Sequence, residues 1–142
     1  MTTDCSFCAI VAGHARASVI LDENDVMAFL DLRQAVPGHV LVVPRRHVPD
    51  IYELQPGEAV VVMQAAVRVA QALRAQFDPP GLNLWQSNGE AGGQEVPHFH
   101  LHVHPRRHGD GLMRVYLDGV PAAADPDRLD AWAGDLRQRL RA

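Results

Sequence analysis

The strongest constraint on this chain is a run of four histidines at every second position: His98, His100, His102 and His104. The three residues between them are apolar. Successive side chains of a β-strand point to opposite faces, so this spacing predicts a strand over residues 98–104 with one packed face and one face of imidazoles. Four polar rings in a core would each need a partner. The pattern therefore predicts a functional site on the imidazole face.

Two kinds of chemistry fit such a face. Imidazoles two residues apart can share a metal ion. Alternatively, one neutral imidazole can act as a nucleophile, because its lone pair is available near pH 7 without an added base. The run lacks the nearby aspartate of dinuclear hydrolases and the downstream glutamate of cupins. The sequence therefore favours nucleophilic catalysis, with a site of metal-only catalysis as the alternative.

The remaining sequence predicts an α+β domain around this strand. A long helix is expected from Pro56 to the break at Asp78, and its apolar stripe is expected to contain Val60, Met63, Val67, Ala70 and Leu73. A short helix is expected near the N-terminus and an amphipathic helix from Asp125. Turn residues separate the expected strands, which are 18–21, 26–30, 39–43, 82–86 and 98–104. No βαβ rhythm repeats, so we expect one antiparallel α+β domain over residues 1–142.

Composition excludes several classes of function. The net charge is −4 and the arginines are scattered, so a general nucleic-acid binder is not expected. All 13 basic residues are arginine, which excludes a lysine Schiff base and a P-loop lysine. No apolar run has the length of a membrane span and the first residues lack a signal-peptide layout. We therefore expect a cytoplasmic protein with neither nucleic acid nor membrane as a partner.

The segment Gly93–Val103, GQEVPHFHLHV, resembles the His-x-His-x-His-x-x signature of the histidine-triad family, in which x is apolar. Three further motifs follow the family's order, so the likeness covers about residues 5 to 108; they are FLD at 29–31, PGHVLVVPRRH at 37–47 and NGE at 88–90. With its Cys-x-x-Cys and Pro-Arg pairs, the chain is most similar to the bacterial zinc-containing branch. The resemblance implies a five-stranded antiparallel sheet, one long helix, a C-terminal helix and a homodimer that pairs through the helix and the sheet edge.

The resemblance also implies a reaction. His100 would attack the α-phosphorus of a purine nucleotide and form a nucleotidyl-histidine, which water then hydrolyses. His102 would donate to the phosphate oxygens and the leaving group, and His39 would line the same pocket. The substrate would be a phosphoramidate, a mixed anhydride or a dinucleotide polyphosphate. The alternatives are nucleotidyl transfer to a phosphate acceptor and a nucleotide-binding interaction module with weak turnover.

The family pattern assigns nucleotide contacts to three segments. Asp31 would accept from the ribose hydroxyls, and an apolar slot would hold the base, formed by Phe7, Ile10, Phe29 and Leu32. Core packing is the alternative for these four residues. The glycine-rich loop would bring backbone N–H groups to the phosphate, with Asn88, Gln94 and Glu95 as its binding residues. Glu95 stands where many relatives have serine or threonine, so a hydroxyl contact is lost here.

Four residues match the zinc ligands of the bacterial branch: Cys5, Cys8, His47 and His98. Two thiolates and two imidazoles complete a tetrahedral shell, so this zinc would be structural. An idle reduced cysteine pair is the alternative. We expect His14 and His108 to be solvent-exposed or hydrogen-bonded. The same holds for His104, with an extension of the pocket's proton network as its alternative.

Overall fold

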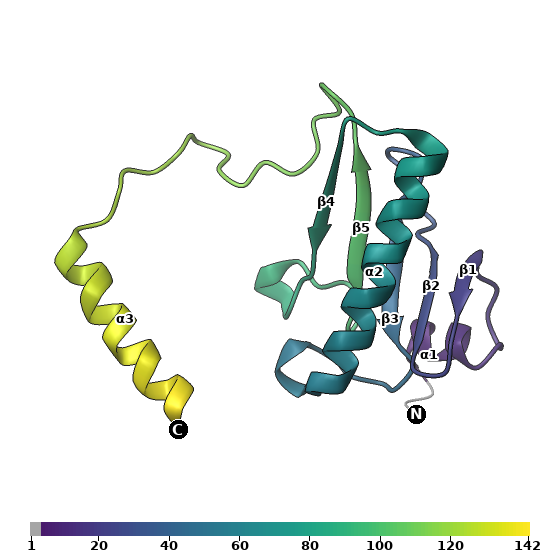
Figure 1. Cartoon of the computed structure of the whole chain (residues 1–142), viewed down its shortest axis with the longest axis horizontal. Helices are drawn as coiled ribbons and strands as arrows, with labels where there is room; N and C mark the ends of the chain where they lie inside the picture. The colour runs from purple at the N-terminus through teal and green to yellow at the C-terminus, as the bar shows by residue number, and fades with distance from the viewer. Residues whose placement is uncertain (1–3) are drawn as a thin grey trace. The chain divides into compact units, whose positions relative to one another are not determined.

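The fold is built on a five-stranded antiparallel sheet in the order β1-β2-β3-β5-β4, as the computed structural model of the chain shows for residues 4–142 (Figure 1). The strands are β1 (Val19–Asp22), β2 (Val26–Leu30), β3 (Val40–Pro44), β4 (Gly81–Trp85) and β5 (Leu101–Arg106). β5 lies between β3 and β4, which makes β4 an edge strand. The predicted α+β class and the five-stranded antiparallel sheet are confirmed.

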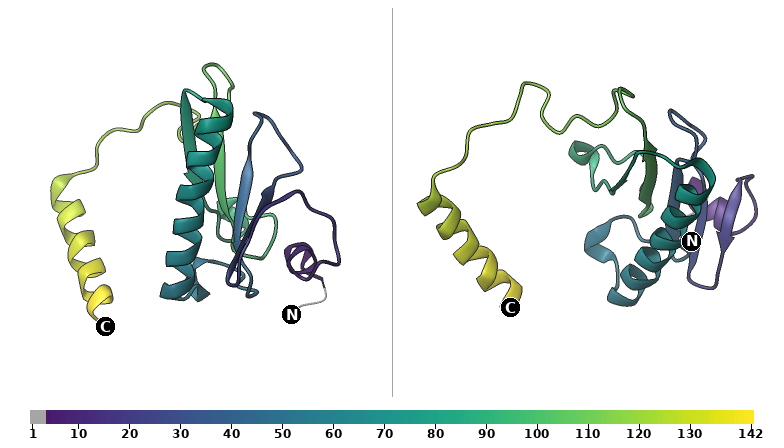
Figure 2. Two further views of the ribbon diagram at one scale, coloured as in Figure 1. Left: turned by 45° about the vertical axis from the view of Figure 1, so that its right-hand side comes forward. Right: turned by 45° about the horizontal axis from the view of Figure 1, so that its top comes forward.

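The central strands β2 and β3 are apolar throughout because both faces of the sheet are covered. Alternate residues go to two clusters. Val26, Ala28, Val40 and Val42 pack in the cluster that contains the buried face of α2 (Pro56–Phe77). The residues between them pack with Phe7, Cys5 and Cys8 at the short helix α1 (Ser6–Val11). Figure 2 shows α2 and α1 on opposite sides of the sheet.

Helix α2 begins and ends at the residues that the sequence predicts. Gln55 and Glu58 form a capping box at its start, and Asp78 adopts the left-handed conformation at its end. The predicted apolar stripe was only partly right. Leu73 is buried and Ala70 packs against the core, but Val60, Met63 and Val67 are about half exposed. The rest of the buried face is made by Val62, Ala65, Ala66 and Val69. The small side chains of Ala65 and Ala66 allow the helix to approach the sheet on that face.

Strand β5 begins at Leu101, three residues later than predicted. β3 pairs with β5 only from Val40 to Val42, although β3 itself continues to Pro44 beside β2. The preceding segment is fixed in another way: the N–H of His98 donates to the carbonyl of Val96 at 2.8 Å. His98 and His100 therefore lie just before the strand, and His102 and His104 lie on it.

The connection between β2 and β3 is held by one side chain. The amide of Gln34 donates to the carbonyls of Asp31 and His39, and its oxygen accepts from the N–H groups of Gly38 and His39. Gly38 has a φ of +103°, and a Cβ built there would lie 2.8 Å from a methyl carbon of Leu73. This turn needs glycine for both reasons.

Residues 111–142 form a second compact unit, apart from the unit that ends at Asp110. It contains α3 (Pro126–Arg141), the predicted C-terminal helix, which is capped by the side chain of Asp125. Its apolar residues Leu129, Trp132, Leu136 and Leu140 are exposed. The single domain over residues 1–142 stays a prediction. Within residues 4–142, no helix has the length and apolar character needed to cross a bilayer.

Candidate active site

A cavity of about 530 Å³ lies over the end of the sheet where β2 stops and β3 starts. It collects most of the residues that the sequence singles out, together with Trp85. Those residues are Phe7, Ile10, Phe29, Asp31, Leu32, His39, Glu95, His100 and His102. The remaining predicted contacts, Asn88 and Gln94, are not among its lining residues.

His100 is 6% exposed, and its Nδ1 lies 2.6 Å from the carbonyl oxygen of His98. A carbonyl can only accept, so Nδ1 carries the proton and Nε2 keeps its lone pair. Burial lowers the pKa of His100, against the opposing effect of this hydrogen bond. The ring of Phe7 meets the imidazole edge to face at 5.1 Å. The neutral tautomer with a free Nε2 is therefore favoured.

His102 and His39 share a hydrogen bond of 2.8 Å between Nδ1 of His102 and Nε2 of His39. On its other side, Nδ1 of His39 lies 3.3 Å from the carbonyl oxygen of Arg33 and 3.7 Å from a carboxylate oxygen of Asp31. Both of these partners accept, so His39 donates from Nδ1 and accepts at Nε2. His102 must then donate from Nδ1, which leaves its Nε2 unprotonated.

Burial, together with the neighbouring imidazoles of His100, His39 and His104, lowers the pKa of His102 to about 3. Burial also lowers the pKa of His39, although the Asp31 carboxylate acts in the opposite direction. A cluster of neutral imidazoles thus lines the cavity of the free protein.

The histidines outside this group lie as follows. His104 is only 3% exposed, and its Nδ1 lies 2.6 Å from the carbonyl oxygen of Pro105. Its ring centroid is 4.3 Å from that of His39, so it packs behind the cavity-lining rings. His14 and His108 are exposed, as expected.

Trp85 is a cavity residue that the sequence analysis missed. It is the last residue of β4 and pairs with His102 of β5, with the two rings stacked at 4.3 Å. The predicted strand at 82–86 contained the residue, but no local pattern indicated which strand would lie beside it. Arg33, Ser87 and Val96 also line the cavity without having been predicted.

Asp31 lies directly after β2, and its N–H donates to the carbonyl of His39 at 3.0 Å. One carboxylate oxygen accepts from the N–H of Arg33 at 2.7 Å. Phe29 and Phe7 meet edge to face at 5.4 Å and are almost fully buried, so they serve the core as well as the cavity wall. Leu32, by contrast, is 96% exposed.

The glycine-rich loop is braced by the two predicted residues that do not line the cavity. Gln94 accepts from the N–H of Gly89 at 2.8 Å and donates to the carbonyl of Pro49 at 2.6 Å. The side-chain oxygen of Asn88 accepts from the N–H of Ile51 at 2.8 Å. These bonds set the loop so that Gly93 and Glu95 line the cavity.

Four metal-ligating side chains converge beside the cavity: Cys5, Cys8, His47 and His98. Nδ1 of His98 lies 3.5 Å from both sulfurs, and Nδ1 of His47 lies 3.3 Å from the Cys8 sulfur. Tetrahedral zinc ligands at about 2.3 Å for sulfur and about 2.1 Å for nitrogen stand roughly 3.5 Å apart. Nε2 of His98 lies 2.8 Å from the carbonyl oxygen of Pro44, which fixes its ring.

The chemistry of this donor set also fits zinc. Burial and the neighbouring Cys5 together raise the pKa of the Cys8 thiol to about 11, so a bound cation is needed to hold two thiolates here. His47 follows Arg46, whose guanidinium makes two hydrogen bonds of 2.7 and 2.8 Å with Glu58 of α2. This pair anchors the segment that carries the third ligand.

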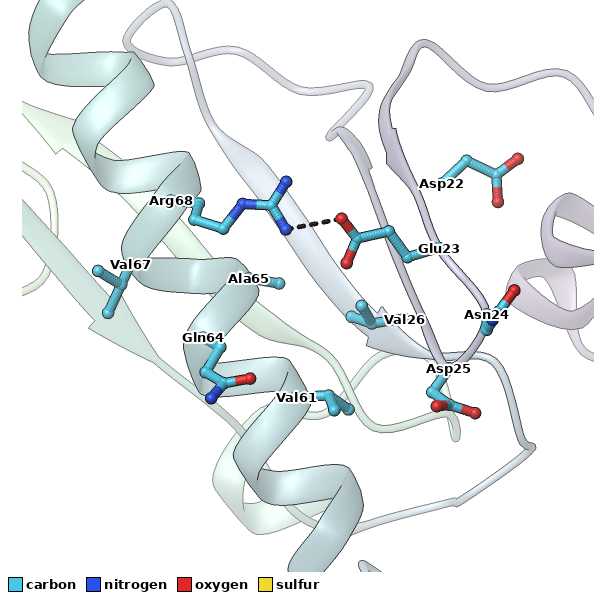
Figure 3. Close-up of a pocket in the computed structure, with 10 residues that line it drawn as sticks. All are labelled: Asp22, Glu23, Asn24, Asp25, Val26, Val61, Gln64, Ala65, Val67 and Arg68. Atoms are coloured by element: carbon cyan, nitrogen blue, oxygen red, sulfur yellow. Dashed lines mark hydrogen bonds and ion pairs between the residues drawn. The ribbon is translucent and has the colours of Figure 1, made fainter.

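A second hollow, of about 840 Å³, lies between α2 and the turn that joins β1 to β2 (Figure 3). An ion pair of 2.6 Å between Arg68 and Glu23 crosses it. Carboxylates, amides and aliphatic side chains make up the rest of its described lining. It contains none of the residues predicted to carry chemistry.

Comparison with known proteins matches residues 12–109 to the HIT domain. Protein hit of Bacillus subtilis is 40% identical over 114 residues, which are 80% of this chain and 79% of that protein. A crystal structure from Streptococcus mutans has a TM-score of 0.90 and 35% identity, covering 99% of this chain and 87% of that one. A zinc-bound histidine triad family protein from Mycobacterium smegmatis has a TM-score of 0.72 and 34% identity, covering 92% and 89%.

Two similar proteins have names that state an activity. The asymmetrical bis(5'-nucleosyl)-tetraphosphatase of Schizosaccharomyces pombe is 37% identical over 83 residues, which are 58% of this chain and 46% of that protein. An adenylylsulfatase of Arabidopsis thaliana is 28% identical over 112 residues, which are 79% of this chain and 57% of that protein. The matched region is less than two thirds of either protein.

Proposed function

The chain belongs to the HIT family, and on that premise we propose that it is a nucleotide hydrolase that uses His100 to attack the α-phosphorus of a purine nucleotide. The observation that carries this proposal is the 2.6 Å hydrogen bond from Nδ1 of His100 to the His98 carbonyl. It leaves Nε2 with a lone pair, on a residue that lines the cavity. The two similar proteins with stated activities both act on nucleotides by name, which supports the same substrate class.

The reaction balances in two steps. Nε2 of His100 forms a bond to the α-phosphorus while the bond from phosphorus to the leaving group breaks, and the leaving group takes a proton. Water then attacks the nucleotidyl-histidine, and the products are a nucleoside monophosphate and the original neutral imidazole. The substrate class is a phosphoramidate, a mixed anhydride or a dinucleotide polyphosphate.

His102 is the candidate proton donor, although it is neutral in the free protein. A phosphate anion in the cavity favours the charged form of nearby imidazoles, so substrate binding raises the pKa of His102. Its hydrogen bond to His39, whose Nδ1 lies 3.7 Å from the carboxylate of Asp31, extends toward a negative charge that stabilises an added proton. Gly93 lines the cavity, but the expected backbone contacts to phosphate do not come from the N–H groups of Gly92, Gly93 and Gln94, which donate to carbonyls within the loop.

The nucleoside end of the substrate is assigned to the opposite part of the cavity. Asp31 accepts from the ribose hydroxyls, and the apolar wall formed by Phe7, Ile10 and Phe29 holds the base. Leu32 contributes from the exposed rim. Glu95 lies at the phosphate end, where its 3.2 Å ion pair with Arg33 limits the repulsion between its carboxylate and the substrate.

We assign a structural zinc ion to Cys5, Cys8, His47 and His98. Four protein ligands complete a tetrahedral shell, so the ion supplies cross-linking and leaves no position for an activated water. The zinc-bound relative from Mycobacterium smegmatis supports the choice of metal. His98 then holds the N-terminal helix to the segment that carries His100.

A homodimer is the proposed assembly. β4 is an edge strand with unpaired backbone groups on one side, and Val60, Met63 and Val67 form an exposed apolar stripe on α2. Antiparallel pairing of two β4 strands would bring the two α2 helices together and bury both stripes.

The test is an assay for release of nucleoside monophosphate from a panel of purine phosphoramidates, dinucleotide polyphosphates and mixed anhydrides. Acid quenching during turnover should trap a nucleotidyl adduct on wild-type protein. His100→Gly should lose nearly all turnover and the adduct while keeping nucleotide affinity within a modest factor. His108→Ala, which removes an exposed histidine, is the matched control. Substantial turnover by His100→Gly would remove the nucleophile assignment.

The same panel separates the two alternatives. Phosphate-dependent exchange with little hydrolysis would indicate a nucleotidyltransferase. Tight nucleotide binding without any turnover would indicate a binding module.

A further inference from the structure

The cavity contains an aromatic contact that the proposed reaction has not used. Trp85 ends β4 and is directly opposite His102 in the antiparallel pair with β5. Side chains of such a cross-strand pair lie on the same face of the sheet, at close range. The indole and imidazole rings are nearly parallel, with an angle of 10° between their planes and 4.3 Å between their centroids.

The His102 ring is therefore fixed by two contacts of different kinds. The stack with Trp85 sets the plane of the ring. The 2.8 Å hydrogen bond to His39 turns the Nδ1 edge of the ring toward His39. With Nδ1 used in this bond, Nε2 has no hydrogen-bond partner within the described chain, and His102 lines the cavity.

We propose that Trp85 is a positioning residue for the reaction assigned to His100: its indole holds the His102 ring so that Nδ1 stays bonded to His39 while Nε2 faces the substrate. This inference rests on the proposed function, since it concerns the proton donor of that reaction. Trp85 contacts His102 and acts through it.

The indole has a second effect, which is electrostatic. The titratable groups around His102 are His100 just before its strand, His104 on the same strand, His39 before β3, and Asp31 after β2. Trp85 brings no charge and keeps water from one face of the ring. An indole can also attract a stacked cation. Desolvation and the repulsion from neighbouring imidazoles outweigh that attraction here, because the pKa of His102 is lowered to about 3.

The test compares Trp85→Ala with the conservative Trp85→Phe and with Trp132→Phe, which removes the chain's other tryptophan outside the cavity. In Trp85→Ala we expect kcat to fall roughly tenfold or more, with KM within about threefold of wild type, because positioning is lost and nucleotide contacts are kept. In the plot of kcat/KM against pH, the acid limb of Trp85→Ala should lie at higher pH than that of wild type. Trp85→Phe should restore most of kcat, and Trp132→Phe should match wild type.

Two readouts do not depend on turnover. NMR titration of the His102 ring should show a higher pKa in Trp85→Ala than in wild type. In Trp132→Phe, where Trp85 is the sole tryptophan, tryptophan emission should stay constant from pH 8 to pH 5, since a stacked imidazolium would quench it. A fluorescence midpoint near 6.5 would overturn the inference even if Trp85→Ala fails to fold.

The outcomes separate this inference from the proposed function. The positioning role alone would be overturned if the wild type turns over substrate and folded Trp85→Ala keeps the wild-type kcat, acid limb and pKa of His102. Absence of turnover in wild type would overturn the proposed function. The stack of Trp85 on His102 would then have no role in catalysis.

Discussion

Nε2 of His39 lies 2.8 Å from Nδ1 of His102, so two rings that are distant in the sequence share one proton. The chain brings them together because His39 directly precedes β3, which is the neighbour of β5, with His102 opposite Leu41. His39 is held at its other nitrogen by the carbonyl of Arg33 and approaches the Asp31 carboxylate. Hydrogen-bond donation therefore has a defined direction, from His102 at the cavity through His39 toward the Arg33 carbonyl and the Asp31 carboxylate.

Removing His39 tests this direction. His39→Ala should lower kcat by about 10²-fold, because His102 loses the acceptor that fixes its tautomer. The ¹⁵N chemical shifts of the His102 ring should change from one tautomer to a mixture. His14→Ala is the control. Unchanged ¹⁵N shifts in the variant would show that the hydrogen bond does not set the tautomer.

Asp31→Asn should weaken ribonucleotides more than 2'-deoxyribonucleotides. An ionised carboxylate can accept from both ribose hydroxyls, and the deoxy sugar already lacks one of them. The measurement is Kd for matched ribo and deoxy monophosphates on both proteins by calorimetry. Equal losses for the two sugars would remove Asp31 from the ribose site.

Replacing Cys5 and Cys8 together by serine should remove the metal and lower the melting temperature. At a free zinc concentration about 1,000 times Kd, binding to the folded state contributes about 4 kcal/mol, which corresponds to roughly 10 °C for a chain of this size. Elemental analysis and thermal melts measure these effects. Turnover per folded molecule should persist at a reduced level, and a folded, wholly inactive variant that zinc restores would show a catalytic metal instead.

Acid should destabilise the fold through His39 and His102, whose pKa values are lowered in the folded state. Above pH 6.5 both rings are neutral in either state, so their contribution to stability is fully present. As pH falls below 6.5 the unfolded chain binds protons that the folded chain does not, and each ring costs about 1.4 kcal/mol per pH unit. For His102 this loss continues to about pH 3.

Denaturant melts between pH 7.5 and 5 measure this slope, with equal zinc in all samples. His102→Gln should reduce the slope by about 1.4 kcal/mol per pH unit relative to wild type. His108→Ala should leave it unchanged. Identical slopes in wild type and His102→Gln would contradict the lowered pKa.

Gly38→Ala should destabilise the fold by about 2–4 kcal/mol, because the left-handed backbone and the contact with Leu73 both penalise a Cβ. Gly57→Ala, at a glycine where a Cβ meets nothing within 4 Å, is the matched control. Because His39 follows Gly38, turnover of the folded variant should fall as well. A Gly38→Ala melt equal to that of Gly57→Ala would refute this account of the turn.

Local signals in the sequence predicted the elements well. Pro56 and Asp78 bound the long helix as expected, and the apolar runs of β2 and β3 became buried strands. Non-local features were not predictable in the same way. The start of β5 depends on how far it pairs with β3, and the buried face of α2 depends on Ala65 and Ala66, whose small side chains carry little hydrophobic signal.

The candidate site follows the same division. Spacing alone predicted the histidine face, whereas the resemblance to the histidine-triad family was needed to name the other residues that line the cavity and the four residues of the metal cluster. Trp85 and Gln34 could not, since one depends on strand neighbours and the other on the shape of a loop. Asn88 and Gln94 match the family motif, but their side chains brace the loop and are absent from the described cavity wall.

His98 presents its ring to the metal cluster and its carbonyl to His100, so one residue belongs to both centres. Coupling between two binding sites is reciprocal: whatever factor metal binding applies to nucleotide affinity, nucleotide binding applies to metal affinity. If the proposed zinc and nucleotide sites are coupled through His98, the metal content of the protein will depend on how much nucleotide surrounds it. At equilibrium with a chelator, the empty and the nucleotide-saturated protein should then retain different amounts of zinc.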